Sequence, residues 1–553
     1  MGKKGTRDNL ILAGFSFTGK TVVAERVAGR MKRRLVDSDH EIATLAGKPI
    51  PQIFVEDGES RFRELEQRVL QWACRRRKAV IAIGGGAVVD ARNRDMFFSS
   101  GVLICLEATP QTIYQRLIAS QQEGGNVERP LLSVPDPLSR IATLKASRQA
   151  YYATADRAVH TDDLSIDQVV EEVISQYEQV MSRRGDDRYV ESLPIVVATV
   201  TQNYPVYVGW NVMDGLGHRM RQMDLEGYAS IISDENVFHY HGAQATESLK
   251  QAGFDVDACL VPPGETTKSI DTAVQIYDWL IDRRTERGHA IVALGGGMVG
   301  DLAGFVASTF LRGLPLVQVP TSLIAMADSS IGGKVAVNHP QAKNLIGSFY
   351  QPRLVLIDVN TLSTLPKREL VSGWAEVVKH GFILDADYVR FLETNAASLG
   401  DLEQQPTTEA IRRSVAIKGS VVSEDERERD RRMILNYGHT IAHGIEAATD
   451  YDRFLHGEAV AIGMAGAARL SQRLGLLDPA AVSRQNGLLQ RLGLPTSCSK
   501  VDIKRVLQAM ELDKKVRQKA VRWVLLESIG RTTFRSDAGS EDVERVLQEL
   551  LTA

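Results

Sequence analysis

The sequence has few cysteines, no long apolar segment and almost no net charge. Its four cysteines form no CxxC pair, which excludes a disulfide framework and a thiolate zinc cluster. No stretch approaches the roughly 20 consecutive apolar residues that span a bilayer, so no membrane partner is expected. A net charge of -3 argues against a general nucleic-acid surface. The N-terminus shows no apolar signal segment, and we therefore expect a cytoplasmic chain whose partners are small molecules.

Length and periodicity predict an α/β protein of three parts, because 553 residues exceed what one hydrophobic core usually organises. Residues 8–178 alternate short apolar runs with charged helical patterns, as a parallel α/β domain does. The stretch 179–190 is polar and charge-dense and is interpreted as a linker. A second α/β pattern covers 191–360. Apolar residues spaced by three and four then predict a helical part over 361–553.

The first part carries a phosphate-binding loop. A strand-like run leads into GFSFTGKT, which places Gly14, Gly19, Lys20 and Thr21 at the fixed positions of GxxxxGK[ST]. Backbone N–H groups of such a loop point at phosphates, the lysine adds a point charge, and the threonine hydroxyl can reach Mg²⁺. The loop therefore predicts a P-loop kinase-type domain that binds ATP with Mg²⁺.

Further motifs in this part resemble the shikimate kinase family. After the P-loop come DSD at 37–39, GESRFRELE, a glycine run at 84–86 and ERPLL from residue 128. The resemblance implies ATP-dependent phosphorylation of shikimate, with Lys20 as a catalytic residue and with Thr21 and Asp37 positioning Mg²⁺. It also implies a set of shikimate contacts: Asp39, Arg63, Gly85, Gly86, Arg129 and Arg148.

One position departs from the family's pattern. Phe17 stands where the family has a glycine, three positions after the first P-loop glycine. Phenylalanine fits there if its φ is negative and its ring points outward, whereas a positive φ would strain it. Two interpretations stay open: a working kinase, or a degenerate domain that binds nucleotide or has a structural role.

The second part contains a dinucleotide-type glycine turn. In ALGGGMVG, Gly295, Gly297 and Gly300 match GxGxxG between a strand and a helix, so a pyrophosphate could lie on the helix N-terminus. The acidic residue that usually follows about 20 positions later is missing, because that region reads VPTS. If NAD binds, its ribose contacts lie elsewhere.

The third part contains candidate metal ligands. His439 and His443 lie four apart on one helical face, and His456 follows in LHGEAV. Such imidazoles can converge on a divalent cation, although a lone pair is more often structural. Glu376 and Lys379 lie three apart between apolar flanks, which favours a buried pair over a surface one.

Ordered motifs across these two parts resemble the 3-dehydroquinate synthase family. They include PPGETTK, GGGMVGD, PTSLIAMADSSIGGKVAVN, SGWAEVVKHG, RRMILNYGHTIAHGIE and LHGEAV. The resemblance implies that Glu376, His439 and His456 bind Zn²⁺ or another divalent ion such as Co²⁺. His443 is thereby moved from the metal to the substrate, and it and Glu428 become candidate proton acceptors.

The same resemblance implies two sets of ligand contacts. NAD contacts are expected from Asp234, Asn236, Glu265, Lys268, Gly296, Gly297, Asp301, Thr321, Ser322, Lys343, Thr361 and Thr364. Contacts to the substrate, 3-deoxy-D-arabino-heptulosonate 7-phosphate, are expected from Arg312, Asp328, Lys334, Asn344, Lys379, Lys418, Arg432 and Asn436, with one of Lys514 and Lys515.

The whole chain is thus expected to be bifunctional, with a shikimate kinase ahead of a synthase that forms 3-dehydroquinate and phosphate. The cationic residues suit an anionic substrate and disfavour a polyol dehydrogenase of similar architecture. A related cyclase acting on another phosphorylated sugar remains an alternative, because fold does not fix substrate. The family also suggests a homodimer through the synthase part.

Overall fold

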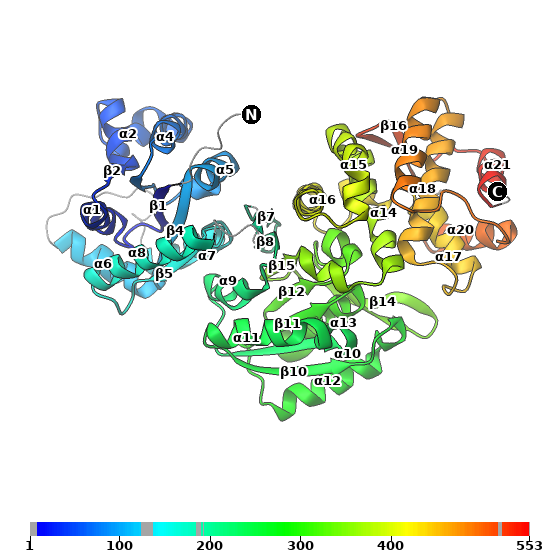
Figure 1. Cartoon of the computed structure of the whole chain (residues 1–553), viewed down its shortest axis with the longest axis horizontal. Helices are drawn as coiled ribbons and strands as arrows, with labels where there is room; N and C mark the ends of the chain where they lie inside the picture. The colour runs from blue at the N-terminus through cyan, green and yellow to red at the C-terminus, as the bar shows by residue number, and fades with distance from the viewer. Residues whose placement is uncertain (1–7, 123–135, 184–189, 192, 518–521, 552–553) are drawn as a thin grey trace. The chain divides into compact units, whose positions relative to one another are not determined.

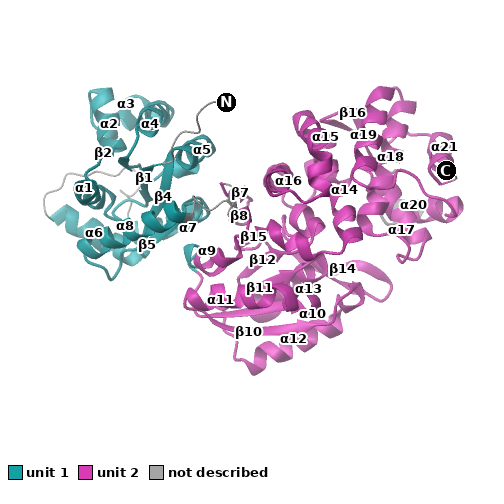
Figure 2. Cartoon of the chain, in the orientation of Figure 1, with its two compact units in different colours: residues 1–189, 221–224 teal, residues 190–220, 225–553 magenta. Residues whose placement is uncertain are grey.

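The computed structural model describes residues 8–122, 136–183, 190–191, 193–517 and 522–551. The chain divides into two compact units (Figure 2). Unit 1 comprises residues 1–189 with 221–224, and unit 2 comprises 190–220 with 225–553. No helix among the described residues is long and apolar enough to cross a membrane.

Unit 1 is built on a five-stranded parallel sheet of order β2-β3-β1-β4-β5. Side chains alternate along β1, so Leu10 and Leu12 join the core on one face while Ile11 and Ala13 join the core on the other. The strands are β1 (Asn9–Gly14), β2 (Arg34–Asp37), β3 (Ala79–Ala82), β4 (Gly101–Glu107) and β5 (Arg157–His160).

Helices cover both faces of this sheet, as both faces of a parallel sheet require. Residues of α1 and α8 pack on one face, and residues of α4 to α7 pack on the other. The helices are α1 (Lys20–Met31), α2 (Ser38–Ala46), α3 (Ile50–Glu56), α4 (Gly58–Cys74), α5 (Ala91–Ser100), α6 (Pro110–Gln122), α7 (Pro137–Tyr152) and α8 (Ile166–Arg183).

Unit 2 begins with a larger sheet of order β10-β9-β11-β12-β15-β8-β6, in which β7 also pairs with β8. The pairs from β10 to β8 are parallel, and β6 and β7 run antiparallel to β8. The strands are β6 (Val190–Glu191), β7 (Ile195–Ala198), β8 (Asn203–Trp210), β9 (Tyr228–Asp234), β10 (Asp255–Val261), β11 (Ala290–Gly295), β12 (Leu316–Pro320) and β15 (Leu354–Asp358).

Shorter elements accompany this sheet. A hairpin of β13 (Lys334–His339) and β14 (Ala342–Phe349) pairs antiparallel. A π-helical turn, η6 (Ala325–Ser329), follows β12, and a 3-10 turn, η5 (Phe310–Arg312), follows α13. The helices are α9 (Leu216–Gln222), α10 (Glu235–Val237), α11 (Ala243–Gln251), α12 (Ile270–Asp282) and α13 (Gly297–Thr309).

The rest of unit 2 is a helical assembly, as the spacing of apolar residues predicts (Figure 1). Its helices are α14 (Lys367–Leu384), α15 (Ala386–Gly400), α16 (Gln404–Glu424), α17 (His439–Ala448), α18 (His456–Arg473), α19 (Pro479–Arg491), α20 (Ile503–Arg517) and α21 (Ser540–Leu551), with a 3-10 turn η8 (Arg431–Asn436). One feature differs from the expected helical part: β16 (Trp523–Ser528) and β17 (Arg531–Arg535) form a hairpin.

Two glycines bring three of these helices together. A Cβ on Gly457 would lie 1.9 Å from the carbonyl oxygen of Ser372, so α18 begins in direct contact with α14. A Cβ on Gly463 would lie 2.1 Å from the carbonyl oxygen of Gly438, so α18 also meets the start of α17. Only glycine permits such close approach of backbones. This packing sets the spacing between the side chains that α14, α17 and α18 carry.

Candidate active sites

The P-loop of unit 1 has its expected place between β1 and α1. The Lys20 ammonium donates hydrogen bonds to the carbonyl oxygens of Gly14 and Phe15, at 2.9 and 2.8 Å. Thr21 Oγ1 donates to Asp37 Oδ2 at 2.8 Å, and Asp37 also caps α2 through its other oxygen. The two side chains expected to position Mg²⁺ therefore lie together, Thr21 at the start of α1 and Asp37 at the carboxyl end of β2.

Phe17 adopts a positive φ, the backbone conformation that strains residues other than glycine. Its φ is 66°, in the left-handed region, between Gly14 and Gly19, which also have positive φ. Its ring packs partly buried against the core below the loop, and its carbonyl accepts a hydrogen bond from Arg116 at 3.4 Å. The loop thus keeps the backbone form of a glycine at this position but carries the strain of a side chain.

The predicted shikimate residues gather around the glycine run after β3. A Cβ on Gly86 would lie 3.1 Å from Arg63 Nη2, and one on Gly84 would lie 3.0 Å from Asp39 Oδ1. One pocket is lined by P-loop residues, Asp37, Asp39 and Gly85 together. The nucleotide loop and two of the predicted shikimate residues, Asp39 and Gly85, therefore border a common space, as phosphoryl transfer requires.

A carboxylate that the sequence analysis missed supports this side of the pocket. Glu66 is 3% exposed and lies 2.8 Å from Arg63, which also pairs with Glu59. Burial raises the pKa of Glu66 against the opposing charge of Arg63. The i,i+3 spacing of Arg63 and Glu66 in GESRFRELE was the available signal.

The two remaining predicted shikimate contacts are Arg148 and Arg129. Arg148 on α7 lies with its guanidinium carbon 5.9 Å from the centre of the Phe15 ring, at the loop. Arg129 lies outside the described residues.

In unit 2, the three predicted metal ligands converge. His439 Nε2 lies 3.6 Å and His456 Nε2 3.8 Å from Glu376 Oε1. Glu376 is 1% exposed, and neither of its carboxylate oxygens receives a hydrogen bond from the described residues, although the Lys379 ammonium approaches one to 2.5 Å. A buried carboxylate that faces two imidazoles suits a divalent cation such as Zn²⁺.

The imidazoles of this cluster differ in their surroundings. Burial, reinforced by the charge of Lys379, holds the pKa of His439 well below its usual range, which favours the neutral form that binds metal. Burial also opposes the charged form of His456, but Glu446 outweighs it and the pKa of His456 is raised. His443 lies beside both, with ring centres 5.5 Å from His439 and 6.4 Å from His456.

Cationic side chains surround the metal-ligand cluster. The Lys379 ammonium donates to the carbonyl oxygen of Leu435 at 2.6 Å, and that of Lys418 donates to Asp328 at 2.5 Å. Burial lowers the pKa of Lys418 to about 8, with the Asp328 charge opposing. The Asp328 side chain is 33% exposed, and its pKa stays well below the usual range because the charges of Lys418 and Lys379 outweigh the cost of desolvation.

A second part of the predicted substrate set lies around Glu428. Glu428 accepts hydrogen bonds from Lys334 and from Asn436, the latter at 3.0 Å. Arg432 is 2% exposed and is held by the carbonyl oxygens of Gly332 and Glu426, at 3.0 and 2.7 Å. Lys514 and Lys515 lie on α20, and Arg312 ends the turn after α13 with a φ of 69°.

The predicted NAD residues follow the carboxyl ends of the sheet. Ser322 follows β12, and its hydroxyl would lie 3.3 Å from a Cβ on Gly296. Asp234 ends β9, the strand beside β11, and caps α10 by accepting from the backbone N–H groups of Asn236 and Val237 at 3.0 Å. An acidic side chain thus lies at the end of the strand beside β11, whereas the sequence after β12 has none at the corresponding position.

Several of the remaining predicted NAD residues lie in two clusters, one around Lys268 and one after β15. Lys268 donates to Asp301 and to Asn344, each at 2.5 Å, and burial raises the pKa of Asp301 to about 6. Thr361 and Thr364 follow β15, where the Thr364 hydroxyl lies 2.9 Å from His241 Nε2. Three other predicted NAD residues make separate contacts. The Glu265 carboxylate accepts a hydrogen bond from the Asn338 amide at 2.9 Å, and the backbone N–H of Thr321 donates to the carbonyl oxygen of Gly295. The Lys343 ammonium lies 4.4 Å from the Tyr451 ring centre.

The sequence analysis also missed two residues in unit 2. Glu446 lies three positions beyond His443 on α17 and contacts His456. His380 is fully buried next to Lys379, with Nδ1 2.7 Å from the Ser414 hydroxyl. Glu446 could have been found as the next residue on the face of α17 that carries the histidines, whereas no signal marked His380 apart from its neighbours.

Three family models match this chain. "3-dehydroquinate synthase N-terminal" matches residues 258–372, "3-dehydroquinate synthase C-terminal" matches 373–516, and "Shikimate kinase" matches 17–178. These matches agree with the two resemblances inferred from the motifs.

Two relatives and one solved structure are also similar to this chain over more than half of its length. The 3-dehydroquinate synthase of Nostoc punctiforme is 45% identical over 350 residues, which are 63% of this chain and 96% of that protein. That of Citrifermentans bemidjiense is 46% identical over 336 residues, 61% of this chain and 93% of that protein. The structure of 2-epi-5-epi-valiolone synthase from Streptomyces hygroscopicus subsp. jinggangensis, with NAD+ and Zn2+ bound, is 29% identical with a TM-score of 0.58 and covers 62% of this chain and 96% of its own.

Fold, sites and comparisons define an enzyme with two catalytic units, one a P-loop phosphotransferase and the other a carbon–oxygen lyase. The chain belongs to the 3-dehydroquinate synthase family and joins to it a shikimate kinase domain.

Proposed function

We propose that unit 2 converts 3-deoxy-D-arabino-heptulosonate 7-phosphate to 3-dehydroquinate and inorganic phosphate. The observation that carries this proposal is the buried carboxylate of Glu376, with the Nε2 atoms of His439 and His456 within 3.8 Å and the Lys379 ammonium at 2.5 Å. Glu376, His439 and His456 would hold Zn²⁺ or Co²⁺, which supplies Lewis acidity at the substrate hydroxyl that is oxidised. NAD, on the glycine turn after β11, supplies reversible hydride transfer.

The chain's own residues bind and orient the substrate. Lys379, Lys418 and Arg432 are each no more than 4% exposed, so their charges act on a carboxylate and a phosphate with little screening by water. Burial also fixes their positions, because each already donates to a protein oxygen. We assign to them, with Lys334 and Asn436, the task of holding the substrate's anionic groups in a fixed orientation.

Two groups are proposed to move protons. His443 lies beside both imidazole ligands without belonging to the ligand set, which suits a general base at the oxidised centre. The Lys334 and Asn436 contacts help to keep the pKa of Glu428 below its usual value, so this carboxylate is ionised and able to accept a proton at neutral pH. A proton taken by one of these groups from the carbon beside the oxidised centre would let phosphate leave by elimination.

For unit 1 we propose ATP-dependent phosphorylation of the shikimate 3-hydroxyl. Lys20 would neutralise charge on the transferred phosphoryl group, and Thr21 and Asp37 would position Mg²⁺. Asp39 and Gly85 border the same pocket, and Arg63 lies against Gly86; these residues would hold shikimate, with Arg148 near the loop. Arg129 belongs to this proposed set by its sequence match alone.

A paired assay on the full chain tests both activities. The synthase should release one phosphate per heptulosonate phosphate without net NADH, because the hydride is returned. The kinase should form ADP only when shikimate is present. Stoichiometric NADH would contradict the lyase proposal, and ADP formation that ignores shikimate would contradict the kinase proposal.

A second candidate for unit 2 is a cyclase that acts on another phosphorylated sugar. Two cyclases of this kind, 2-epi-5-epi-valiolone synthase and 2-deoxy-scyllo-inosose synthase, share its fold at 29% identity. Phosphate release from a hexose phosphate but not from the heptulosonate phosphate would favour that candidate. For unit 1, the positive φ of Phe17 favours a degenerate domain as the alternative, which shikimate-independent ATP binding without turnover would support.

We also propose that the enzyme acts in the cytoplasm as a homodimer through unit 2. The family resemblance supports pairing, as do Leu345 and Phe349 on β14, which are 66% and 45% exposed although apolar. Sedimentation at micromolar concentration should give twice the chain mass, and a monomer there would contradict the proposal. Cell fractionation tests the compartment.

A further inference from the structure

The three proposed metal ligands differ in how far their side chains are exposed to solvent. The side chain of Glu376 is 1% exposed and that of His439 is 13% exposed, whereas that of His456 is 39% exposed. His456 is also the first residue of α18, where the chain enters the helix from a loop. An imidazole in this place has more rotational freedom than one inside a helix, so something must fix its ring if Nε2 is to face Glu376.

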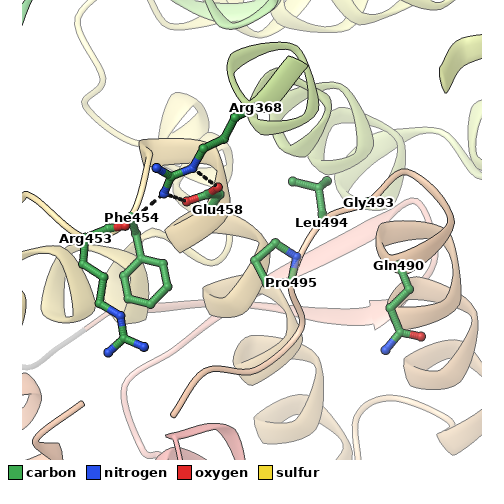
Figure 3. Close-up of a pocket in the computed structure, with 8 residues that line it drawn as sticks. All are labelled: Arg368, Arg453, Phe454, Glu458, Gln490, Gly493, Leu494 and Pro495. Atoms are coloured by element: carbon green, nitrogen blue, oxygen red, sulfur yellow. Dashed lines mark hydrogen bonds and ion pairs between the residues drawn. The ribbon is translucent and has the colours of Figure 1, made fainter. Parts of the chain in front are cut away.

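The backbone at this helix start is held firmly, but by groups that do not touch the imidazole. Glu458 accepts the N–H of Leu455 at 2.9 Å and a two-pronged contact from Arg368, with both distances 2.8 Å. Arg368 also donates to the carbonyl oxygen of Arg453 at 2.9 Å (Figure 3). This network fixes where α18 begins and leaves the side-chain torsions of His456 to be set elsewhere.

Glu446 is the group that contacts the ring. Its Oε1 lies 3.1 Å from His456 Nδ1, on the opposite side of the ring from the Nε2 that faces Glu376. The Glu446 side chain is 11% exposed, so water competes weakly for this contact. A carboxylate at Nδ1 keeps the proton on that nitrogen and leaves the Nε2 lone pair free for a cation.

The other imidazole ligand has a weaker partner. His439 Nδ1 lies 3.3 Å from the carbonyl oxygen of Tyr437, a neutral acceptor two residues away. His439, His443 and Glu446 lie at positions i, i+4 and i+7 of α17, so one helix face carries one proposed ligand, one proposed base and the carboxylate that supports the second ligand.

We propose that Glu446 is a positioning residue that sets the tautomer and the orientation of His456 for binding of a divalent cation. The inference rests on the proposed ligand set Glu376, His439 and His456. The alternative to this proposal is that Glu446 pairs with His456 at the edge of the site and has no effect on metal affinity.

Affinity for Co²⁺ tests this inference without recourse to activity. The metal-free full chain is titrated with Co²⁺ against a chelator of known affinity, and the visible absorbance of the ion is followed. Glu446→Ala should weaken binding by about 10- to 100-fold, the usual effect of losing a carboxylate behind a histidine ligand. Glu446→Gln, which can still accept from Nδ1 but carries no charge, should lose less. The visible spectrum of the Co²⁺ complex should also shift in Glu446→Ala, because the geometry around the ion changes.

The matched control is Asp450→Asn, in the turn that follows α17. Its carboxylate is 77% exposed and contacts Arg505, and asparagine tolerates its φ of 55°. This variant should bind Co²⁺ as the unaltered chain does. Shikimate-dependent ADP formation serves as a check on the fold of unit 1, and circular dichroism as a check on unit 2.

Unchanged Co²⁺ affinity in folded Glu446→Ala, with strong loss in His456→Ala, would overturn the inference and leave the ligand set intact. Unchanged affinity in His456→Ala would overturn the ligand set and this inference with it. Should Glu446→Ala fail to fold in unit 2, Glu446→Gln decides: weakened affinity supports the positioning role, and unaltered affinity refutes it.

Discussion

At the residue scale, the most unusual position is Phe17. A left-handed φ costs an ordinary residue about 1 kcal/mol relative to glycine, and a P-loop that must cradle phosphates gains from an unstrained backbone. The sequence could show that glycine was replaced but not which φ the loop would keep, because φ here is set by the phosphate-binding turn as a whole. The structure keeps the turn and strains the residue.

We therefore predict that Phe17→Gly is more stable than Phe17→Ala by about 1 kcal/mol in unit 1. Both variants remove the half-buried ring, so their difference isolates the strain of a Cβ at positive φ. The measurement is the urea midpoint for loss of kinase activity in the full chain, with synthase activity as internal reference. Equal midpoints, or a higher one for Phe17→Ala, would mean that the loop is not held at positive φ.

Lys418 gives a prediction on pH. Because burial lowers the pKa of its ammonium to about 8, raising the pH through 8 removes the charge proposed to hold the substrate. The synthase kcat/KM should therefore fall on the alkaline side with a midpoint near pH 8. Lys418→Arg should move that limb upward, because arginine stays charged throughout this range.

The control for this assignment is Lys334→Arg, since the Lys334 side chain is 50% exposed and its substitution should leave the limb in place. An alkaline limb that stays near pH 8 in Lys418→Arg would assign the titration to another group.

At the element scale, helix packing determines the proposed metal site more than any single side chain. Glu376, His439 and His456 come from α14, α17 and α18, and the glycine contacts at the start of α18 set how closely these helices approach. Patterns in the sequence predicted the helices because apolar residues recur every three or four positions. They could not predict the approach, which depends on contacts between residues as distant as Ser372 and Gly457.

The same limit explains what the sequence analysis found and missed. The strand, glycine turn and helix at β11 and α13 were predicted, because a local motif and an apolar run fix them. The hairpin of β16 and β17 was missed, because two strands of five or six residues beside longer helices leave a weak alternation. Among site residues, Glu446 could have been found on the helix face that carries the histidines, but its contact with His456, ten positions further along the chain, is made only in the folded structure.

We predict that Gly457→Ala displaces the start of α18 and weakens the metal site. Its Cβ would meet the carbonyl oxygen of Ser372 at 1.9 Å, so the helices must separate, at a cost of about 1–3 kcal/mol. Synthase activity and metal retention after dialysis should both fall. Gly487→Ala on α19 is the control: nothing lies within 4 Å of its Cβ, and it should slightly stabilise the helix. Full metal retention in Gly457→Ala would contradict the packing argument.

At the scale of the whole molecule, two compact units carry two separate sets of proposed catalytic residues. Each set of ordered motifs likewise lies within one stretch of the chain. The activities they imply are not consecutive, since the synthase product must be processed further before it becomes shikimate. Direct transfer of an intermediate between the sites is therefore not implied, and each unit should work without the chemistry of the other.

This independence yields a reciprocal prediction. Glu376→Ala removes the central carboxylate of the proposed metal site, so it should abolish metal retention and phosphate release while shikimate-dependent ADP formation stays within about twofold of the unaltered chain. Lys20→Met removes the P-loop charge and should lower ADP formation by at least about 100-fold while leaving phosphate release intact. Both activities are measured on the same preparations, and thermal unfolding confirms that each variant is folded. Loss of both activities in either folded variant would mean that the two units depend on each other, because independent catalytic units predict that each substitution removes one activity and spares the other.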